Sequence, residues 1–213
     1  GRPLFIWTML YSTINNMNNV IARIDGTEGS QAKKDQVKGQ AKALRAFCYL
    51  NIASFYQFSY LKDKSALTAP IYTEPSTIST PGKKKASLEE IYTLIKSDLT
   101  DADNLLKGYS RNNKDKINRN VVNGILARTY LNTGEWSKAA ASARIAREGF
   151  AFMAPEKYKE GFNDIENAEW IWGHKQTQEQ SDASYAFHYL DVSSSGSYYY
   201  SFMADPYFKN LHF

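Results

Sequence analysis

The chain has 213 residues, 43% of them apolar, which is enough for one substantial hydrophobic core or for a helical domain with part of a second. The 26 basic and 22 acidic residues give a net charge of +4, and only Lys83-Lys84-Lys85 forms a tight basic run. Nucleic acid is not an expected partner, because no basic stripe is interleaved with aromatic residues. No run of about 18 apolar residues occurs, so no membrane-spanning segment is predicted.

Five amphipathic helices are predicted before residue 150, because apolar side chains recur at intervals of three and four residues. Their expected ranges are residues 4–24, 31–57, 87–106, 121–132 and 136–148. In the second helix the expected apolar stripe is Val37, Leu44, Phe47 or Cys48, Asn51 and Phe55. Cys48 is the only cysteine, so an internal disulfide is excluded and a small buried side chain is expected.

The third helix opens with Ser87-Leu88-Glu89-Glu90, a capping box in which the Ser87 oxygen accepts from the backbone and Glu90 reaches back. Its acidic side chains, Asp98, Asp101 and Asp103, are expected on or beside the solvent face. The cluster Asn15, Asn16, Asn18 and Asn19 in the first helix is unusual, because Asn is a poor helix former. We expect Asn18 to bond to a neighbouring helix or connector.

The fourth and fifth helices form a hairpin around Asn132-Thr133-Gly134, where Gly134 permits the left-handed conformation common at helix ends. Tyr130 and Trp136 are expected to be buried against Ala139 and Ala143. A bulky pair against an alanine stripe is typical of tetratricopeptide units, which need neighbouring helices to stack on. The sequence therefore predicts a mainly α fold of tetratricopeptide-like antiparallel helix pairs.

Four motifs in chain order resemble one known family. They are Trp7-x-x-Leu10-Tyr11-x-x-Ile14, Gly39-x-Ala41-x-x-Leu44-Arg45-Ala46-Phe47-x-Tyr49, Ser87-x-Glu89-Glu90-Ile91-Tyr92 with Asp98-Leu99, and Ala127-Arg128-x-Tyr130-Leu131-x-x-Gly134-x-Trp136-x-x-Ala139. Together they resemble the SusD/RagB family. The resemblance implies a lipid-anchored protein on the outer membrane of a Bacteroidetes-type bacterium, which captures glycans beside a SusC-like TonB-dependent transporter.

The chain departs from that family at both ends. Members are longer, begin with a lipoprotein signal and an anchoring cysteine, and carry a large loop-rich C-terminal portion, so a fragment is expected here. We expect a helical scaffold over residues 1–149 and the start of a loop-rich, partly β ligand-side region over residues 150–213. Within the latter, residues 169–174 are expected to form a short strand in which Trp170 and Trp172 pack on the helices.

No catalytic or metal-binding pattern stands out. The chain has no His-Glu-x-x-His motif and no Gly-rich phosphate loop, and His174 and His188 lack partners at zinc spacing. A glycosidase needs two carboxyl groups that face a sugar across a cleft, which an acidic stripe on a helix does not supply. We therefore expect a non-enzymatic protein without a cofactor or metal.

Aromatic residues make up 14% of the chain, and their rings can stack on the flat C–H faces of sugars. The consecutive side chains of Tyr198, Tyr199 and Tyr200 cannot all point inward, so at least one is expected to be exposed. Tyr60 and Tyr72 flank the long connector over residues 61–86. The candidate ligand-binding residues are therefore Tyr198, Tyr199, Tyr200, Tyr72 and Tyr60, each with a structural role as the alternative.

The predicted function is capture of an oligosaccharide or related nutrient for delivery to the transporter. The rival is a tetratricopeptide-type adaptor that binds a peptide in its groove. An adaptor would line that groove with repeated Asn, Lys and Arg, whereas a capture protein would place aromatic residues in its loops, as this chain does. The helical half, residues 4–149, is expected to dock on the transporter, with the part after Phe150 on the ligand-facing side.

Overall fold

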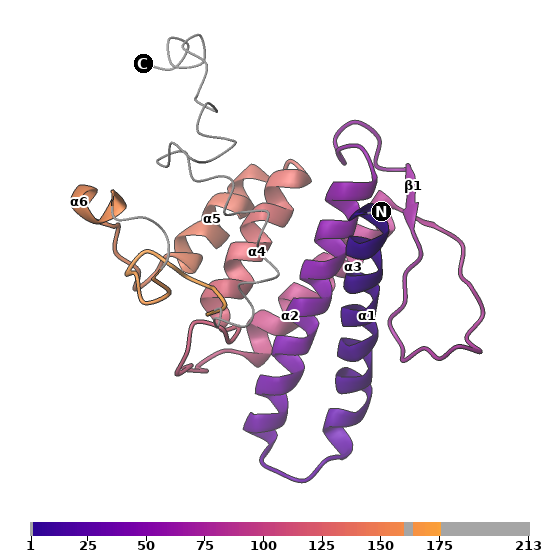
Figure 1. The fold of residues 1–213 in the computed structure, drawn as a ribbon, viewed down its shortest axis with the longest axis horizontal. Coiled ribbons are helices and arrows are strands. Elements are labelled where there is room, and N and C mark those ends of the chain that lie inside the picture. Colours follow the sequence, from indigo (N-terminus) through magenta and orange to yellow (C-terminus); the bar gives the residue numbers. More distant parts are fainter. Residues whose placement is uncertain (1, 160–163, 176–213) are drawn as a thin grey trace, which may run out of the picture. The chain divides into compact units, whose positions relative to one another are not determined.

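The computed structural model describes residues 2–159 and 164–175 (Figure 1). The chain divides into two units, Gly1–Gly173 and His174–Phe213, and the fold described here is that of the first. Its elements are α1 (Arg2–Arg23), η1 (Ile24–Gly26), α2 (Gln31–Tyr56), β1 (Leu67–Ala69), β2 (Ala86–Ser87), α3 (Leu88–Leu105), α4 (Arg119–Asn132), α5 (Trp136–Ala146) and α6 (Pro155–Tyr158). The prediction of five helices before residue 150 is confirmed.

The helices α1 to α5 pack in chain order, each of the first four on the next one, so the architecture is mainly α and tetratricopeptide-like (Figure 1). β1 and β2 form a short antiparallel pair that closes the connector between α2 and α3. The capping box at Ser87 is present, with the Ser87 side chain accepting from the backbone of Glu90 and the Glu90 side chain accepting from that of Ser87.

Helix α2 lies between α1 and α3, and its second half is buried on almost every side. The expected one-sided stripe is therefore partly wrong, because Val37 and Phe55 are 41% and 63% exposed. Small residues allow this close packing. At Gly39 an added Cβ would lie 2.8 Å from Leu106 Cγ, so only glycine lets the end of α3 approach α2 so closely.

The α4–α5 hairpin has the expected turn but a different buried face. Gly134 has φ +75°, which confirms its role in ending α4. Trp136, however, is 59% exposed, and Ala143 is also exposed, so their expected burial is wrong. The buried side chains of α5 are Ala139, Ser142 and Ala146. This face is centred between Ala139 and Ala146, and the helical repeat therefore turns Trp136 and Ala143 to its edge.

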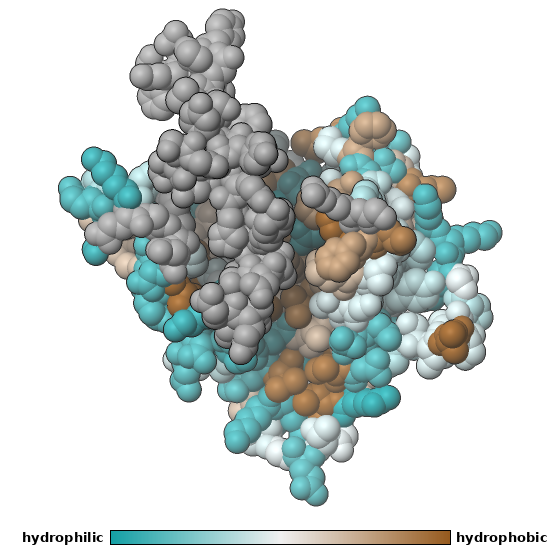
Figure 2. All heavy atoms as spheres, in the orientation of Figure 1, coloured by the Kyte–Doolittle hydropathy of each residue, from teal (hydrophilic) through white to brown (hydrophobic). Residues whose placement is uncertain are grey.

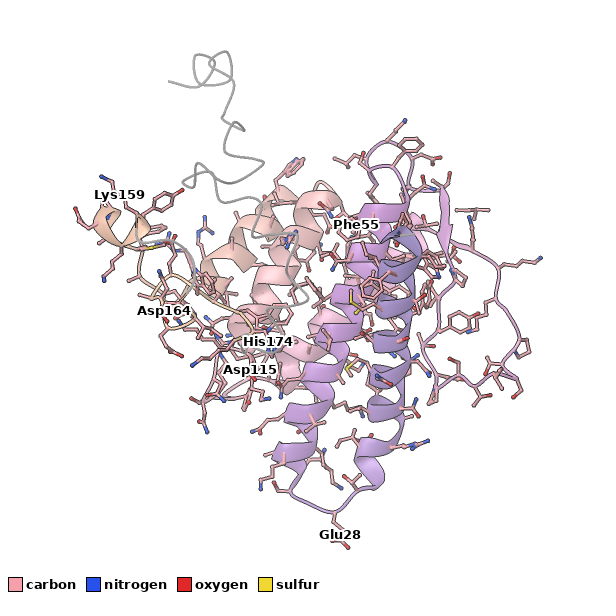
Figure 3. All side chains as sticks on the ribbon, in the orientation of Figure 1. Glu28, Phe55, Asp115, Lys159, Asp164 and His174 are labelled. Carbon is pink, nitrogen blue, oxygen red and sulfur yellow. The ribbon has the colours of Figure 1, made fainter. Side chains whose placement is uncertain are left out.

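The expected strand at residues 169–174 is also wrong, because this segment forms turns, bends and irregular backbone. Trp172 nevertheless packs on the helices as expected, with its ring edge-on to Phe47 at a centroid distance of 5.3 Å. Its Nε1 donates to the carbonyl of Asp115 at 3.2 Å. Arg111 donates to the carbonyl of Ile171, so residues 111–117 and 164–173 lie side by side, in the region where Figure 3 labels Asp115 and Asp164.

Candidate functional site

A buried polar cluster joins the first three helices. Arg45 of α2 donates from Nε and Nη2 to the two carboxylate oxygens of Asp98 on α3, both at 2.7 Å. Its Nη1 donates to Oδ1 of Asn18 on α1 at 2.8 Å and to the carbonyl of Thr73 at 3.1 Å. Asp98 is only 1% exposed, so its expected place on the solvent face is wrong. The charge is tolerated there because Arg45 pairs with both oxygens.

The same cluster holds the backbone of residues 70–76, which we call the clamped loop. Asn18 Nδ2 donates to the carbonyls of Tyr72 and Glu74 at 3.0 and 2.9 Å. This confirms the expected connector contact of Asn18. Tyr49 Oη donates to the carbonyl of Tyr72 at 3.1 Å and accepts from its backbone N–H at 2.7 Å. Burial raises the pKa of Tyr49 to about 12, so it stays a neutral donor at physiological pH.

Two further side chains of α1 hold the ends of the clamped loop. Tyr11 Oη donates to the carbonyl of Pro70 at 2.7 Å. Asn15 donates to the carbonyl of Ser76 at 3.1 Å and accepts from its N–H at 2.7 Å. An irregular segment whose backbone groups are paired by buried side chains is fixed almost as firmly as a strand. The helices thus present the connector in one conformation.

The candidate Tyr72 lies at the centre of the clamped loop and is half-buried. Its ring meets that of Tyr11 edge-on at 6.2 Å. Its hydroxyl accepts from the backbone N–H of Lys83 at 3.0 Å, and Lys83 Nζ lies 5.2 Å from its ring centroid. Tyr72 therefore joins the outgoing and returning limbs of the connector, and a ligand-binding role for it stays a prediction.

The candidate Tyr60 lines a pocket of about 250 Å³ at the C-terminal end of α2. The pocket combines two tyrosine rings with amide and hydroxyl groups, and its lining residues are Ala53, Ser54, Gln57, Phe58, Ser59, Tyr60, Tyr92 and Asn132. The Tyr60 and Tyr92 rings meet edge-on at 5.1 Å. We call this the Tyr60 pocket.

Hydrogen bonds fix the walls of the Tyr60 pocket. Tyr60 Oη donates to Glu89 Oε2 at 2.7 Å, and Asn132 Nδ2 donates to Tyr92 Oη at 3.0 Å. Burial raises the pKa of Tyr60 to about 12, and the bond to Glu89 adds to the shift. The bond from Tyr60 in turn lowers the pKa of Glu89, which also pairs with Lys64 at 3.1 Å. The hydroxyls of Tyr60 and Tyr92 therefore remain protonated, and Glu89 remains ionised, at neutral pH.

The two candidate residues that the structure describes, Tyr60 and Tyr72, do not share a site. Tyr60 and Tyr72 have different neighbours, and Tyr198, Tyr199 and Tyr200 lie outside the described residues. Sequence reasoning missed Tyr92 and Asn132, which come from α3 and α4 and share no local motif with Tyr60. Among residues 2–159 and 164–175, no group of three acidic, His or Cys side chains could hold a metal ion, and no helix is long and apolar enough to cross a membrane.

Comparison with known proteins agrees with this fold. The SusD-like family model described as "Starch-binding associating with outer membrane" matches residues 1–131. A SusD-like carbohydrate binding protein of Bacteroides vulgatus ATCC 8482 is 46% identical, with a TM-score of 0.88 over 97% of this chain and 44% of that protein. A candidate sugar-binding protein of the same strain is 30% identical, with a TM-score of 0.69 over 78% of this chain and 40% of its own.

A third solved structure is a SusD superfamily protein of Bacteroides thetaiotaomicron VPI-5482. It shares the fold at 24% identity, with a TM-score of 0.73 over 84% of this chain and 39% of the length of that protein. The chain thus spans less than half the length of each of these relatives. No curated protein matches it. The family match over residues 1–131 and the 46% identity to a SusD-like protein agree with the motifs in the sequence, and the chain belongs to the SusD-like family.

Proposed function

We propose that this chain binds an oligosaccharide at the bacterial cell surface, without catalysis, for delivery to a SusC-like TonB-dependent transporter. The observation that carries the binding step is the Tyr60 pocket, in which tyrosine rings lie beside the amides of Gln57 and Asn132. Rings stack on the apolar faces of sugars, while amides and hydroxyls bond to sugar hydroxyl groups. The pocket volume of about 250 Å³ suits one sugar unit of a longer chain.

Binding at this pocket alone is expected to be weak. Each ring contact supplies only about 1 kcal/mol, which barely offsets the cost of association. A glycan that also contacts the candidates Tyr198, Tyr199 and Tyr200, or Tyr72, would bind more tightly. We propose that residues 150–213 begin the ligand-facing region and that residues 1–149 form the scaffold.

The charge state of Glu89 supports a non-enzymatic role. Glu89 is the carboxylate that contacts the Tyr60 pocket, through the hydroxyl of Tyr60. Hydrogen bonds lower its pKa, so it does not hold a proton to give to a leaving group at neutral pH. Sugar hydrolysis needs such an acid opposite a second carboxyl group, and no lining residue of this pocket is acidic.

The transporter contact is proposed on the helical scaffold, residues 4–149. Leu131 and Trp136 are 51% and 59% exposed at the α4–α5 turn, and the side chains of Leu61 and Trp136 both lie next to Gly134. An exposed Trp is typical of interface centres, and an exposed apolar patch around it marks an interaction site. A stable interface would bury more than about 1,200 Å² in total. The Tyr60 pocket lies beside Leu61, so bound sugar would sit at the border of this contact. A lipid anchor that precedes the chain would hold the complex in the outer membrane.

The binding step is tested by calorimetry of the full-length protein with a panel of neutral oligosaccharides. Tyr60→Ala and Asn132→Ala should each weaken binding about tenfold, which corresponds to about 1.4 kcal/mol. Phe5→Ala, which removes an exposed ring on α1, outside the pocket and the proposed ligand-facing region, is the control. Unchanged binding in both pocket variants would place the site elsewhere, and loss in Tyr198→Ala, Tyr199→Ala or Tyr200→Ala would then assign it to those residues.

The transporter contact is tested by purification of the lipoprotein from native membranes. A transporter subunit should accompany the protein and be lost with Trp136→Ala, whereas Tyr60→Ala should retain it. Recovery without any transporter subunit, or a complex in which the helices face away from it, would overturn the proposal. Turnover of a glycan that depends on one carboxylate would overturn the non-enzymatic role.

A further inference from the structure

We propose that residues 77–85, which we call the lysine loop, dock on a negatively charged lipid surface. Ile78 would enter the boundary between headgroups and acyl chains, and Lys83, Lys84 and Lys85 would pair with lipid phosphates. The inference rests on the proposed cell-surface location. It adds a membrane contact that is separate from sugar binding in the Tyr60 pocket.

The base of the lysine loop is held rigidly by the clamped loop. Side chains of α1 and α2 bond to the backbone at Pro70, Tyr72, Thr73, Glu74 and Ser76. The returning limb is tied to the same base, because Lys83 donates its backbone N–H to Tyr72 Oη. A loop fixed in this way loses little conformational entropy when it binds a surface, so even a few contacts can have a net effect.

The tip of the lysine loop has an apolar side chain on a backbone turn that is closed by two internal hydrogen bonds. Ile78 is fully exposed. Around it, the N–H of Thr77 donates to Thr80 Oγ1 at 2.8 Å, and the N–H of Thr80 donates to the carbonyl of Thr77 at 3.0 Å. These internal bonds lower the cost of moving the tip out of water. Figure 2 shows an isolated hydrophobic group at the right-hand edge, on the side where the connector leaves β1.

The charge of the lysine loop favours an anionic partner. Lys84 and Lys85 are exposed, and no ion pair involves either within the described part of the chain. Between Pro70 and Ala86 the sequence holds three lysines and one acidic residue, Glu74. Basic residues near a membrane are attracted to anionic lipids, and an adjacent aliphatic side chain adds apolar burial. An acidic glycan would use the lysines but would give Ile78 no apolar partner.

The position of the lysine loop also suits a membrane contact. The connector starts at β1 beside the beginning of α1 (Figure 1), where Tyr56 donates to the carbonyl of Pro3 and Tyr11 to that of Pro70. From β1 the connector runs along α1 (Figure 1) to Ser76, which bonds to Asn15, so a lipid anchor attached ahead of α1 would bring the lysine loop to the same surface when α1 lies along the membrane. The anchor and the loop together would then supply two membrane signals, which is what stable attachment commonly needs.

The test is co-sedimentation of the purified, unlipidated protein with vesicles. One set contains phosphatidylcholine alone, and the other contains phosphatidylcholine with phosphatidylglycerol. We expect binding to the anionic vesicles that falls as salt rises. Lys84→Glu with Lys85→Glu should weaken it at least tenfold, and Ile78→Ser several-fold. Lys33→Glu with Arg128→Glu changes the net charge equally on exposed helix positions and should leave binding within about twofold.

Circular dichroism would verify that each variant keeps its helices. The proposal is overturned by failure to bind anionic vesicles, or by equal losses in the loop and control variants. It is also overturned if the loop lysines are needed to bind a soluble acidic polysaccharide and the protein does not bind vesicles, because the partner would then be a glycan. Neutral sugar binding should be unchanged in the loop variants, so its loss in Tyr60→Ala tests the proposed function independently.

Discussion

Two clusters of charged side chains link helices in this protein, one around Arg45 and the other around Glu135. Both join α3 to another part of the scaffold through direct hydrogen bonds between opposite charges. Arg45 and Asp98 have side chains that are only 5% and 2% exposed, whereas Lys96 and Glu135 are 28% and 27% exposed. The chemistry is therefore similar, but the surrounding medium differs.

The difference shows what each cluster can specify. In the buried cluster, Arg45 and Asn18 use their remaining hydrogen-bonding groups on the backbone of the clamped loop. Any other loop conformation would leave those groups unpaired in the core, which is costly. Glu135 is near water, which can replace any partner it loses. The buried cluster therefore fixes the conformation of a connector, and the surface cluster only joins the start of α5 to the middle of α3.

The largest effect is expected from Asp98→Ala, which leaves the Arg45 charge buried without its partner. The loss of unfolding free energy should be about 3–5 kcal/mol, measured by chemical denaturation. The control is Asp101→Ala, since Asp101 pairs with Lys42 at 2.6 Å but is half exposed. It should cost less than about 1 kcal/mol. Equal costs for the two variants would remove the distinction between buried and surface clusters.

The second effect tests the packing of the α4–α5 hairpin, away from the buried cluster. Ala139 is 4% exposed, so Ala139→Leu should overpack the crossing and lower the unfolding free energy by about 1–3 kcal/mol. Ala143→Leu places the same side chain at an exposed position of the same helix and should change it by less than about 0.5 kcal/mol. A larger loss of unfolding free energy in Ala143→Leu than in Ala139→Leu would mean that Ala143 is buried, as the sequence predicted.

Local signals predicted the helices well. Asn132-Thr133-Gly134 and Ser87-Leu88-Glu89-Glu90 located the α4 end and the α3 start, because turn and cap chemistry depends on neighbouring residues. The periodicity of α2 was less informative. A helix packed on both sides buries residues all around, and a search for one stripe then assigns exposed positions such as Phe55 to the core.

The polar contacts between elements were harder to predict. Asp98 follows Ile95 by three residues and precedes Leu99, so it lies on the apolar face of α3, and Arg45 lies among Ala43, Ala46 and Tyr49. Two opposite charges on buried faces were therefore a usable signal for an ion pair. The Tyr60 pocket had no such signal, because it depends on the start of α3 and the end of α4 meeting the end of α2 in space.

A smaller effect is expected where the connector returns to the helices. Ser87→Ala removes the oxygen that accepts from the backbone N–H of Glu90 and should cost about 1 kcal/mol of unfolding free energy. Ser97→Ala, at an exposed position inside the same helix, is the control and should be nearly neutral. If both cost the same, the capping box does not determine where α3 begins.

The smallest effect concerns Glu135 and depends on pH. Hydrogen bonds from Lys138 and Lys96 lower the pKa of Glu135 from 4.5 to about 2 in the folded protein. A lowered pKa means that the ionised form stabilises the fold. Its contribution is therefore complete above pH 4.5 and is lost as the pH falls through about 2.

Because the side chain is partly exposed, Glu135→Gln should cost less than about 1 kcal/mol at pH 6. Denaturation at pH 6, 4 and 2.5 should show the difference between the protein and the variant decrease at each step. A difference that stays constant down to pH 2.5 would mean that these lysines do not hold Glu135 in its ionised form.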